Sequence, residues 1–361
     1  MSGAISGLPR EAVRRIAVLR ALQLGDLLVA VPALRALRAG FPAAEITLVG
    51  LPWARAFAAR FARYIDRFVE FGGWEGIVEA PYEPARAAAF AAAQRAYGYD
   101  LAIQLHGSGT TSNACVLAWG ARATAGYYPP GAPCPAGLAV AAPYPEHLPE
   151  VLRCLRLVER LGCRARGTHL EWPIAPAERA QAVTLLAPLA GRPRPWVGLH
   201  PGARAPARRW PAARFAAVGD ALARRLGASL VLTGGPDEVA LVGEVAARLV
   251  APALRLAGGL SLETLAAVIA SLDLFVSNDT GPAHLAQAVG TPSVIVFGPA
   301  DPRRWAPLDP RHRVVRQAVG CSPCGHWECP IDHRCLRRIA PARVVAAAET
   351  VLAEEVRACG A

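Results

Sequence analysis

The chain has 361 residues, 53% of them hydrophobic, which excludes a disordered protein and fits two domains better than one. It contains no apolar run near the roughly 18 residues of a membrane helix and begins without a secretory signal pattern, so we expect a cytoplasmic protein. The net charge is +11, but the arginines that carry it are scattered, which argues against nucleic-acid binding and favours attraction to phosphorylated molecules.

The first part of the chain predicts a parallel α/β domain. Residues 15–20 (RIAVLR) form an apolar strand, which leads through the loop ALQLGD into a helical stretch at residues 27–40. Further strands are predicted at residues 45–50 (EITLVG) and from Asp100 onward (DLAIQLHG). This order of strand, loop and helix is typical of nucleotide-binding α/β units, and we assign the domain to residues 1–175.

The second part repeats the pattern more regularly. Residues 171–195 mix prolines with one short helix, as a connection between domains does. Four apolar strands then alternate with helices, namely PWVGLH, ASLVLTGG, DLFVSN and PSVIVFG, and Ser261 is a good N-cap for one of those helices. We predict a doubly wound sheet over residues 176–340, followed by an amphipathic helix at residues 341–361 that crosses back to the first domain.

The strongest candidate site lies where the strand DLFVSN ends. The loop Asp279, Thr280, Gly281 follows it directly, and a helix begins there. Backbone N–H groups and the positive end of the helix dipole make such a turn suitable for a diphosphate. His284 lies one turn into the helix and could direct a ring nitrogen to the same phosphates. The alternative is that Asp279 only caps the helix and His284 packs between helices.

Four segments of the chain together resemble glycosyltransferase family 9, the bacterial lipopolysaccharide heptosyltransferases. DTGPAHLAQAVGTPSVIVFGPADPRRW is similar to the signature of that family. The opening strand with its Gly-Asp loop, the segment LHPGARAPARRWPAARFAAVGDAL and the loop LVLTGGPDE are also similar to family segments and occur in the same order. The resemblance implies a GT-B architecture, in which two Rossmann-like domains face a central cleft. It also implies an inverting transfer that requires no cofactor and no catalytic metal.

The resemblance assigns roles to individual residues. It implies that Asp26 is the general base and that Glu238 lies near the ribose of the donor. Around the donor diphosphate it places four residues: Asp279, Thr280, Gly281 and His284. The family has a lysine where this chain, which contains no lysine, has Arg208. Together with Arg209, this guanidinium can hold phosphate oxygens in a fork, although it cannot give up a proton as a lysine can.

Some of these residues also have a simpler explanation. Asp26 could serve only as the N-cap of a helix that starts at Leu27, and Glu238 could be a first-turn acid that suits the helix dipole. On the acceptor side we assign Gly25, His106 and Ser108, the last two from the glycine-rich turn LHGSGTTSN. The alternative for that turn is an ordinary polar loop.

Four cysteines lie within a short stretch near the end of the chain, at Cys321, Cys324, Cys329 and Cys335. Their spacing is not that of a standard zinc finger, although thiolates are good ligands for zinc and for iron–sulfur centres. The stretch resembles a cysteine-bearing segment in part of the same family that is not catalytic. A bound metal and a reduced structural cluster both stay open, and we assign no metal to the site.

The expected function is the transfer of a heptose from ADP-heptose to the inner core of lipopolysaccharide. The acceptor is then an anionic, lipid-anchored glycan, which an arginine-rich surface would attract at the inner face of the membrane. The alternatives are a related transferase with another sugar or a non-lipid acceptor, a nucleotide-sugar epimerase or hydrolase of the same shape, and a silent binding module.

Overall fold

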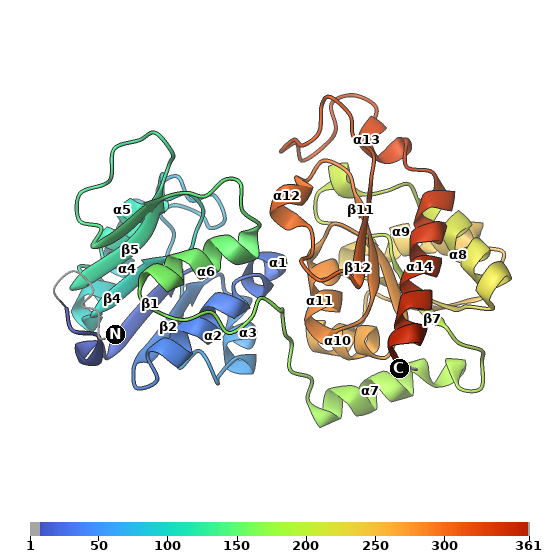
Figure 1. Ribbon diagram of the computed structural model, residues 1–361, viewed down its shortest axis with the longest axis horizontal. Coiled ribbons are helices and arrows are strands. Elements are labelled where there is room, and N and C mark those ends of the chain that lie inside the picture. The colour runs from blue at the N-terminus through green and yellow to red at the C-terminus, as the bar shows by residue number, and fades with distance from the viewer. Residues whose placement is uncertain (1–7, 360–361) are drawn as a thin grey trace. The chain divides into compact units, whose positions relative to one another are not determined.

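The protein folds into two compact units. The computed structural model describes residues 8–359, and the chain divides between Thr168 and His169 (Figure 1). Each unit contains one sheet of six strands, all of them parallel to their neighbours. The predicted α/β class is therefore confirmed.

The sheet of the first unit has the strand order β3-β2-β1-β4-β5-β6. Its strands are β1 (Arg15–Leu19), β2 (Glu45–Gly50), β3 (Arg67–Glu70), β4 (Leu101–Gln104), β5 (Ala123–Tyr128) and β6 (Val140–Pro143). In β1 both faces are buried: Ala17 and Leu19 belong to a core cluster on one side, and Ile16 and Val18 are also fully buried. Burial of both faces explains why β1 reads as a continuous apolar run.

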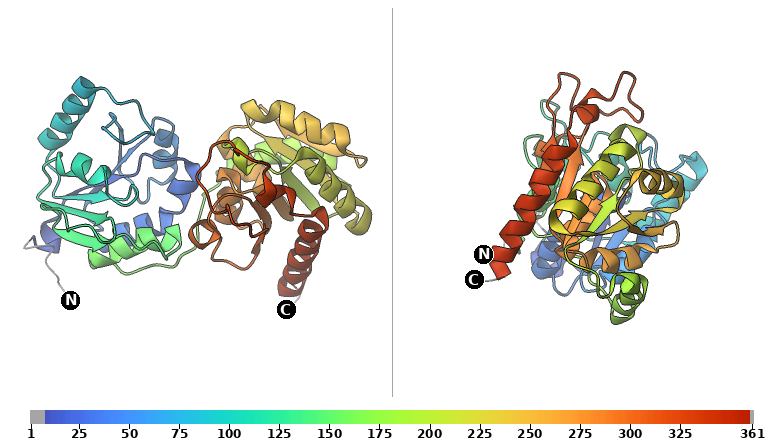
Figure 2. Two further views of the ribbon diagram at one scale, coloured as in Figure 1. Left: turned by 90° about the horizontal axis from the view of Figure 1, so that it is seen from above. Right: turned by 90° about the vertical axis from the view of Figure 1, so that its right-hand side faces the viewer.

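Helices cover both faces of this sheet. They are α1 (Leu24–Leu28), α2 (Val31–Gly40), α3 (Ala54–Arg60), α4 (Pro84–Tyr97), α5 (Ser112–Leu117) and α6 (Glu150–Arg160), with the 3₁₀ turn η1 (Arg10–Ala12). In Figure 2, α2 and α6 lie together on one face and α4 lies on the other. The single helical stretch predicted over residues 27–40 is wrong. Pro32 has no N–H to donate and its ring would clash with the preceding turn, so the chain forms α1 and α2 instead.

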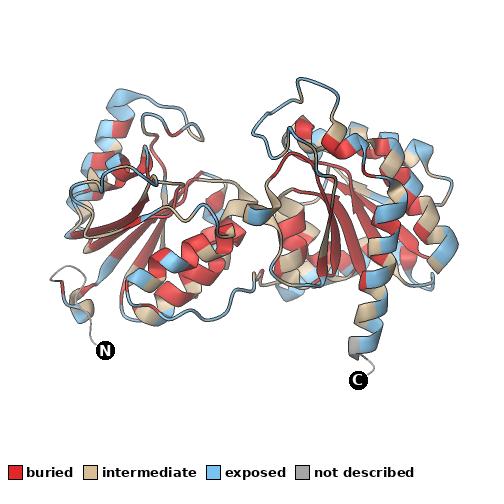
Figure 3. Cartoon of the chain, turned by 45° about the horizontal axis from the view of Figure 1, so that its top comes forward, coloured by how far each residue is buried: buried red, intermediate tan, exposed pale blue. Residues whose placement is uncertain are grey.

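The sheet of the second unit has the strand order β12-β11-β10-β7-β8-β9. Its strands are β7 (Trp196–His200), β8 (Ser229–Gly234), β9 (Ala253–Ala257), β10 (Leu274–Asn278), β11 (Ser293–Phe297) and β12 (His312–Arg316). The four predicted strands correspond to β7, β8, β10 and β11. Figure 3 shows these strands buried, whereas the surrounding helices alternate buried and exposed residues.

The helices of the second unit are α7 (Pro176–Leu186), α8 (Ala212–Leu226), α9 (Val239–Arg248), α10 (Leu262–Ala270), α11 (Gly281–Val289), α12 (Pro302–Trp305), α13 (Arg334–Arg337) and α14 (Pro341–Cys359). Three 3₁₀ turns accompany them: η2 (Ala187–Leu189), η3 (Pro206–Arg208) and η4 (Pro236–Glu238). The predicted cap of α10 is confirmed, because the Ser261 hydroxyl accepts the Thr264 N–H at 3.1 Å. Helix α14 packs on α8 and on β10 to β12; its predicted crossing to the first unit stays a prediction.

Both sheets reverse their strand order beside a central strand. In the first unit the chain runs outward from β1 to β2 and β3, then returns to the other side of β1 as β4. In the second unit β10 returns to the open side of β7 in the same way. Open α/β sheets bind ligands at the carboxyl ends of strands next to such a reversal. Across residues 8–359, no helix combines the length and the apolar character of a membrane span.

Candidate active site

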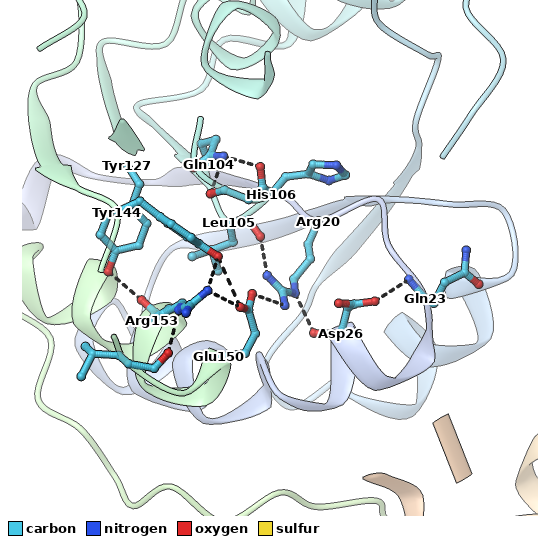
Figure 4. A network of polar contacts seen from close by, with 12 residues as sticks. Arg20, Gln23, Asp26, Gln104, Leu105, His106, Tyr127, Tyr144, Glu150 and Arg153 are labelled. Carbon is cyan, nitrogen blue, oxygen red and sulfur yellow. Dashed lines mark hydrogen bonds and ion pairs between the residues drawn. The ribbon is translucent and has the colours of Figure 1, made fainter. Parts of the chain in front are cut away.

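The base predicted from the sequence lies at the reversal point of the first sheet. Asp26 is the third residue of α1, which follows β1, and its half-buried carboxylate accepts the Gln23 N–H at 3.3 Å (Figure 4). The N-cap residue is Gln23, so a helix beginning at Leu27 with Asp26 as its cap is wrong. Gly25 lies in the same turn. The carboxylate therefore stabilises the first turn from inside the helix.

Arg20, which the sequence did not indicate as a site residue, lies beneath this turn. It directly follows β1 and is almost fully buried. Its Nε donates to the Asp26 carbonyl oxygen at 2.7 Å, and its Nη1 donates to the carbonyl oxygen of Leu105. Its Nη2 is 3.4 Å from a carboxylate oxygen of Glu150 on α6. Burial opposes the charged form, but the neighbouring Cys154, Glu150 and Asp26 act in the opposite direction, and the pKa of Arg20 is raised.

The candidate acceptor residues lie on the loop after β4, next to β1 in the sheet. His106 is buried, with its Nε2 3.5 Å from the Glu79 carboxylate. Its carbonyl oxygen accepts hydrogen bonds from the Gln104 side chain at 2.5 Å and from the Ser112 hydroxyl at 2.7 Å. The Ser108 hydroxyl is 3.0 Å from that of Thr110. The loop is thus ordered by its own polar contacts, and Arg20 joins it to α1 through the Leu105 carbonyl.

In the second unit, the predicted diphosphate turn lies between β10 and α11. Thr280 is the N-cap residue of α11, and the buried Asp279 forms an ion pair with Arg208, Nη1 to Oδ2, at 3.1 Å. The N-cap position of α11 is therefore held by Thr280 and not by Asp279. Pro282 has no N–H and the Ala283 N–H donates to the Thr280 carbonyl at 3.0 Å, so the Gly281 amide is a candidate backbone donor at the helix start.

His284 lies inside the first turns of α11 and is buried. Its Nδ1 is 3.2 Å from the Gln287 side-chain amide, and its ring centroid lies 6.2 Å from that of Trp305. Burial, reinforced by the positive charge of Arg208, lowers the pKa of His284 from 6.5 to about 4. The imidazole is therefore neutral near pH 7 and can offer a hydrogen bond without a charge.

The loop after β7 carries both candidate arginines. Arg208 ends η3 and keeps 40% of its side chain exposed, whereas the Arg209 Nε donates to the Ala203 carbonyl at 2.8 Å. Asn278, the last residue of β10, holds this loop from the neighbouring strand. Its Oδ1 accepts the Trp210 N–H at 3.0 Å, and its Nδ2 donates to the Pro201 carbonyl at 2.7 Å. Sequence reasoning missed Asn278, although its place directly before Asp279 was a signal.

Glu238 lies at the end of β8, in η4. Its carboxylate accepts the Gly235 N–H at 2.8 Å and lies 3.5 Å from Nε2 of the buried His200. The Nδ1 of His200 is 3.1 Å from the Thr233 hydroxyl. Burial lowers the pKa of His200, and the charge of Glu238 opposes that effect. A Cβ at Gly202 would lie 2.0 Å from the Glu238 carboxylate, so this glycine allows the β7 loop to lie directly against the acid.

The candidate donor residues therefore converge within the second unit. Arg208, Glu238 and Asp279 follow β7, β8 and β10, which are adjacent strands in the order β10-β7-β8. Since the strands are parallel, these residues share the carboxyl edge of the sheet at its reversal point.

The four clustered cysteines occupy the segment that precedes α13 and the helix itself. Burial raises the pKa of Cys335, and the negative charge of the thiolates of Cys321, Cys329 and Cys324 would raise it further. The segment is attached to the loop after β7, because the Ala207 N–H of η3 donates to the Trp327 carbonyl at 3.0 Å. Among residues 8–359, no three His, Cys, Asp or Glu side chains are arranged to hold a metal ion.

Comparison with known sequences gives one family. The family model described as glycosyltransferase family 9 (heptosyltransferase) matches residues 87–334. Lipopolysaccharide heptosyltransferase 3 of Escherichia coli is 40% identical over 121 residues, which are 33% of this chain and 35% of that protein. Lipopolysaccharide heptosyltransferase 2 of Salmonella typhimurium is 33% identical over 168 residues, 45% of this chain and 48% of that protein. The matched part thus spans half or less of these relatives.

Solved structures share the fold over nearly the whole chain. A glycosyl transferase family 9 structure from Veillonella parvula has a TM-score of 0.75 at 24% identity, covering 98% of this chain and 99% of that one. The E. coli ADP-heptose lps heptosyltransferase II has a TM-score of 0.71 at 24% identity, covering 94% of this chain and 99% of that one. These similarities confirm the predicted pair of Rossmann-like domains.

Proposed function

This chain belongs to glycosyltransferase family 9, and on that premise we propose that it transfers a heptose from ADP-heptose to the inner core of lipopolysaccharide. The relatives that it matches are named for lipopolysaccharide and lipooligosaccharide heptose transfer. One arrangement supports the proposal most strongly. Arg208, the start of α11 and Glu238 share one sheet edge, where a nucleoside diphosphate needs a cation, a backbone donor and a partner for the ribose.

The donor diphosphate is proposed to bind at the start of α11. Arg208 supplies a planar guanidinium with exposed N–H groups, and Asp279 orients it through their ion pair. The Gly281 amide, the Thr280 hydroxyl and the neutral imidazole of His284 add hydrogen bonds. Arg209 holds the loop through the Ala203 carbonyl. As the glycosidic bond breaks, these groups stabilise the negative charge on the departing ADP, and no step of the proposal uses a metal.

The ribose is proposed to bind Glu238. One carboxylate oxygen already accepts the Gly235 N–H, which fixes the side chain against the β7 loop. A fixed carboxylate can accept hydrogen bonds from both ribose hydroxyls. Nε2 of the buried His200 lies 3.5 Å from that same oxygen.

Asp26 is proposed to be the general base. Its carboxylate takes the proton of the acceptor hydroxyl while that oxygen attacks the anomeric carbon of the heptose and ADP departs from the opposite face, which inverts the configuration. Gly25, His106 and Ser108 are proposed to contact the acceptor. The arginine-rich composition suits an anionic, lipid-anchored acceptor, which we propose is met at the inner membrane face by a cytoplasmic enzyme.

The test is ADP release from ADP-heptose with and without a heptose-acceptor lipopolysaccharide core. A transferase releases ADP only with the acceptor. A hydrolase releases it from the donor alone, an epimerase alters the donor without release, and a binding module does neither. Hydrolase, epimerase or binding-module behaviour contradicts the proposal, and so does turnover only with another sugar nucleotide.

Asp26→Asn provides the matched test of the base. Asparagine keeps a side-chain oxygen for the Gln23 N–H but cannot take a proton at neutral pH, so we expect kcat to fall about a hundredfold to ten-thousandfold. The KM for ADP-heptose should change by less than about twofold, because a base acts in the transition state. Asp66→Asn is the control, since Asp66 also accepts a backbone N–H, that of Ile46 at 2.7 Å. Unchanged kcat for Asp26→Asn removes the base role.

A further inference from the structure

The helix that carries Asp26 is too short to be stable alone. With five residues, α1 forms little more than one turn, and helix nucleation is unfavourable at that length. The Gln23 N–H and the Asp26 carboxylate stabilise only its start. The Asp26 main chain is held from outside the helix, by the Nε of Arg20 at 2.7 Å.

The same guanidinium reaches a second segment of the candidate site. Its Nη1 donates to the carbonyl of Leu105, the residue before His106. One side chain directly after β1 thus binds the main chain on both sides of the reversal point of the sheet. A guanidinium can do this because its N–H groups point in fixed, divergent directions within one plane.

A buried charge needs a partner, and Glu150 provides it. Glu150 lies 3.4 Å from Arg20 and 3.5 Å from Arg153, and the Tyr144 hydroxyl donates to it at 3.4 Å (Figure 4). Arg153 is itself held, because its Nε donates to the Leu148 carbonyl at 2.7 Å. These polar side chains lie inside the unit: Arg20, Glu150 and Arg153 are all at most 5% exposed.

Burying such a network costs desolvation free energy, which offsets much of the attraction between its charges. Apolar side chains of similar volume often stabilise a protein as well as a buried ion pair does or better. What apolar side chains cannot do is fix two main-chain carbonyls in position. The geometry, rather than the stability, is therefore the feature that distinguishes this arrangement.

We infer that Arg20, held by Glu150, is a positioning residue that fixes Asp26 relative to the loop of His106. This inference rests on the base and acceptor roles proposed above for those two segments. In the proposed mechanism, Arg20 touches neither donor nor acceptor. It acts through the backbone, so its loss should lower the rate of transfer and leave donor binding in the second unit unchanged.

The test compares Arg20→Met with Arg38→Met. Arg38 is a matched control because its guanidinium also binds main chain and a carboxylate in the first unit. Its Nη1 donates to the Ala44 carbonyl at 2.7 Å and its Nη2 pairs with Asp66. Ala44 and Asp66 directly precede β2 and β3, so this contact lies at the amino ends of the strands, whereas Arg20 lies at their carboxyl ends. We expect Arg20→Met to lower kcat by roughly a hundredfold with the KM for ADP-heptose unchanged within about twofold. Arg38→Met should keep kcat within about threefold of the original.

Hydrogen exchange gives a second measurement that does not need activity. Arg20→Met should speed amide exchange roughly tenfold in residues 23–30 and in residues 105–112 together, and not in the second unit. If the original protein shows no heptose transfer but the two segments still loosen together, the proposed function fails and the structural coupling stands. If neither segment loosens, or only one does, the inference is overturned.

A milder variant covers the case in which Arg20→Met does not fold. Glu150→Gln keeps an oxygen for the Arg20 and Tyr144 donors but removes the charge. We expect kcat to fall several-fold, and the Glu150→Asp variant, which restores the charge on a shorter side chain, to recover part of it. Equal losses of kcat in Arg20→Met and Arg38→Met, or a raised donor KM with kcat unchanged, would show a merely structural role.

Discussion

His312 is a buried histidine at the start of β12, the edge strand of the second sheet. Its Nδ1 is 2.9 Å from the Ser293 hydroxyl oxygen. Burial lowers the pKa of His312 from 6.5 to about 4, although the charge of Asp309 acts in the opposite direction. Between these two values the unfolded chain binds a proton that the folded protein does not. The free energy of unfolding should therefore decrease as the pH falls from 6.5 towards 4, with the full contribution present above pH 6.5.

We predict that His312→Gln removes part of this pH dependence. Glutamine can still hydrogen bond to Ser293 but does not titrate. For the original protein, the contribution of His312 at pH 4.5 should be a loss of roughly 2 to 3 kcal/mol relative to pH 7.5, and the variant should lack it. Urea unfolding at both pH values measures the difference. His147→Gln, at an exposed position, is the control, and parallel curves for all three proteins would contradict the prediction.

At the scale of an element, the loop after β7 depends on a glycine. Gly202 lies against the carboxylate of Glu238, and a Cβ there would come within 2.0 Å of Oε1. The end of a flexible side chain can move, so Gly202→Ala should displace Glu238 without unfolding the sheet.

The expected result for Gly202→Ala is weaker ADP binding, by about tenfold, because a carboxylate that bonds the ribose would be misplaced. Inhibition by inorganic pyrophosphate should not change, since Arg208 and α11 are not disturbed. Calorimetric titration with ADP and with pyrophosphate separates the two. Gly243→Ala on α9, where an added Cβ meets nothing within 4 Å, is the control. Equal weakening for both ligands would show that the whole loop moved.

Each strand that the sequence patterns predicted has both faces covered. All described residues of β8, β10 and β11 are buried, and each reads as an apolar run between helices. By contrast, β3, β9 and β12 lie at sheet edges and include exposed or partly exposed residues such as Glu70 and Arg255, so their sequences carry no comparable signal. Which strands neighbour each other could not be predicted from local pattern either.

The candidate site was predictable where a motif is contiguous. Asp279 to His284 and the GGPDE loop stand together in the sequence, and their resemblance to a family signature identified them. Arg20 and His200 were missed because their partners are distant in the chain: Glu150 is 130 positions from Arg20. Contacts of that separation depend on the strand order and are not encoded in any local spacing.

At the scale of the molecule, each unit has its own core and its own set of candidate residues. The apolar cluster around Trp119 lies within the first unit and that around Trp210 within the second. All of the proposed donor residues belong to the second unit. A ligand that binds only the folded state stabilises the part of the protein whose unfolding abolishes binding.

We therefore predict that ADP protects the two units unequally. At a free concentration of about 100 times its Kd, ADP should raise the free energy of unfolding of the second unit by about 2.7 kcal/mol. Amide exchange there should then slow about a hundredfold. Exchange in the core strands of the first unit, such as β1, should change much less. Mass spectrometry of peptides from both units measures this. Equal protection of both would contradict an ADP site confined to the second unit.

The peptide bond between Thr168 and His169 separates two complete hydrophobic interiors. A recombination event at this point would break neither of them. Under the proposed assignment of the acceptor to the first unit and the donor to the second, we expect acceptor range and nucleotide preference to be separable, so that chimeras joined here add the same sugar to a different glycan.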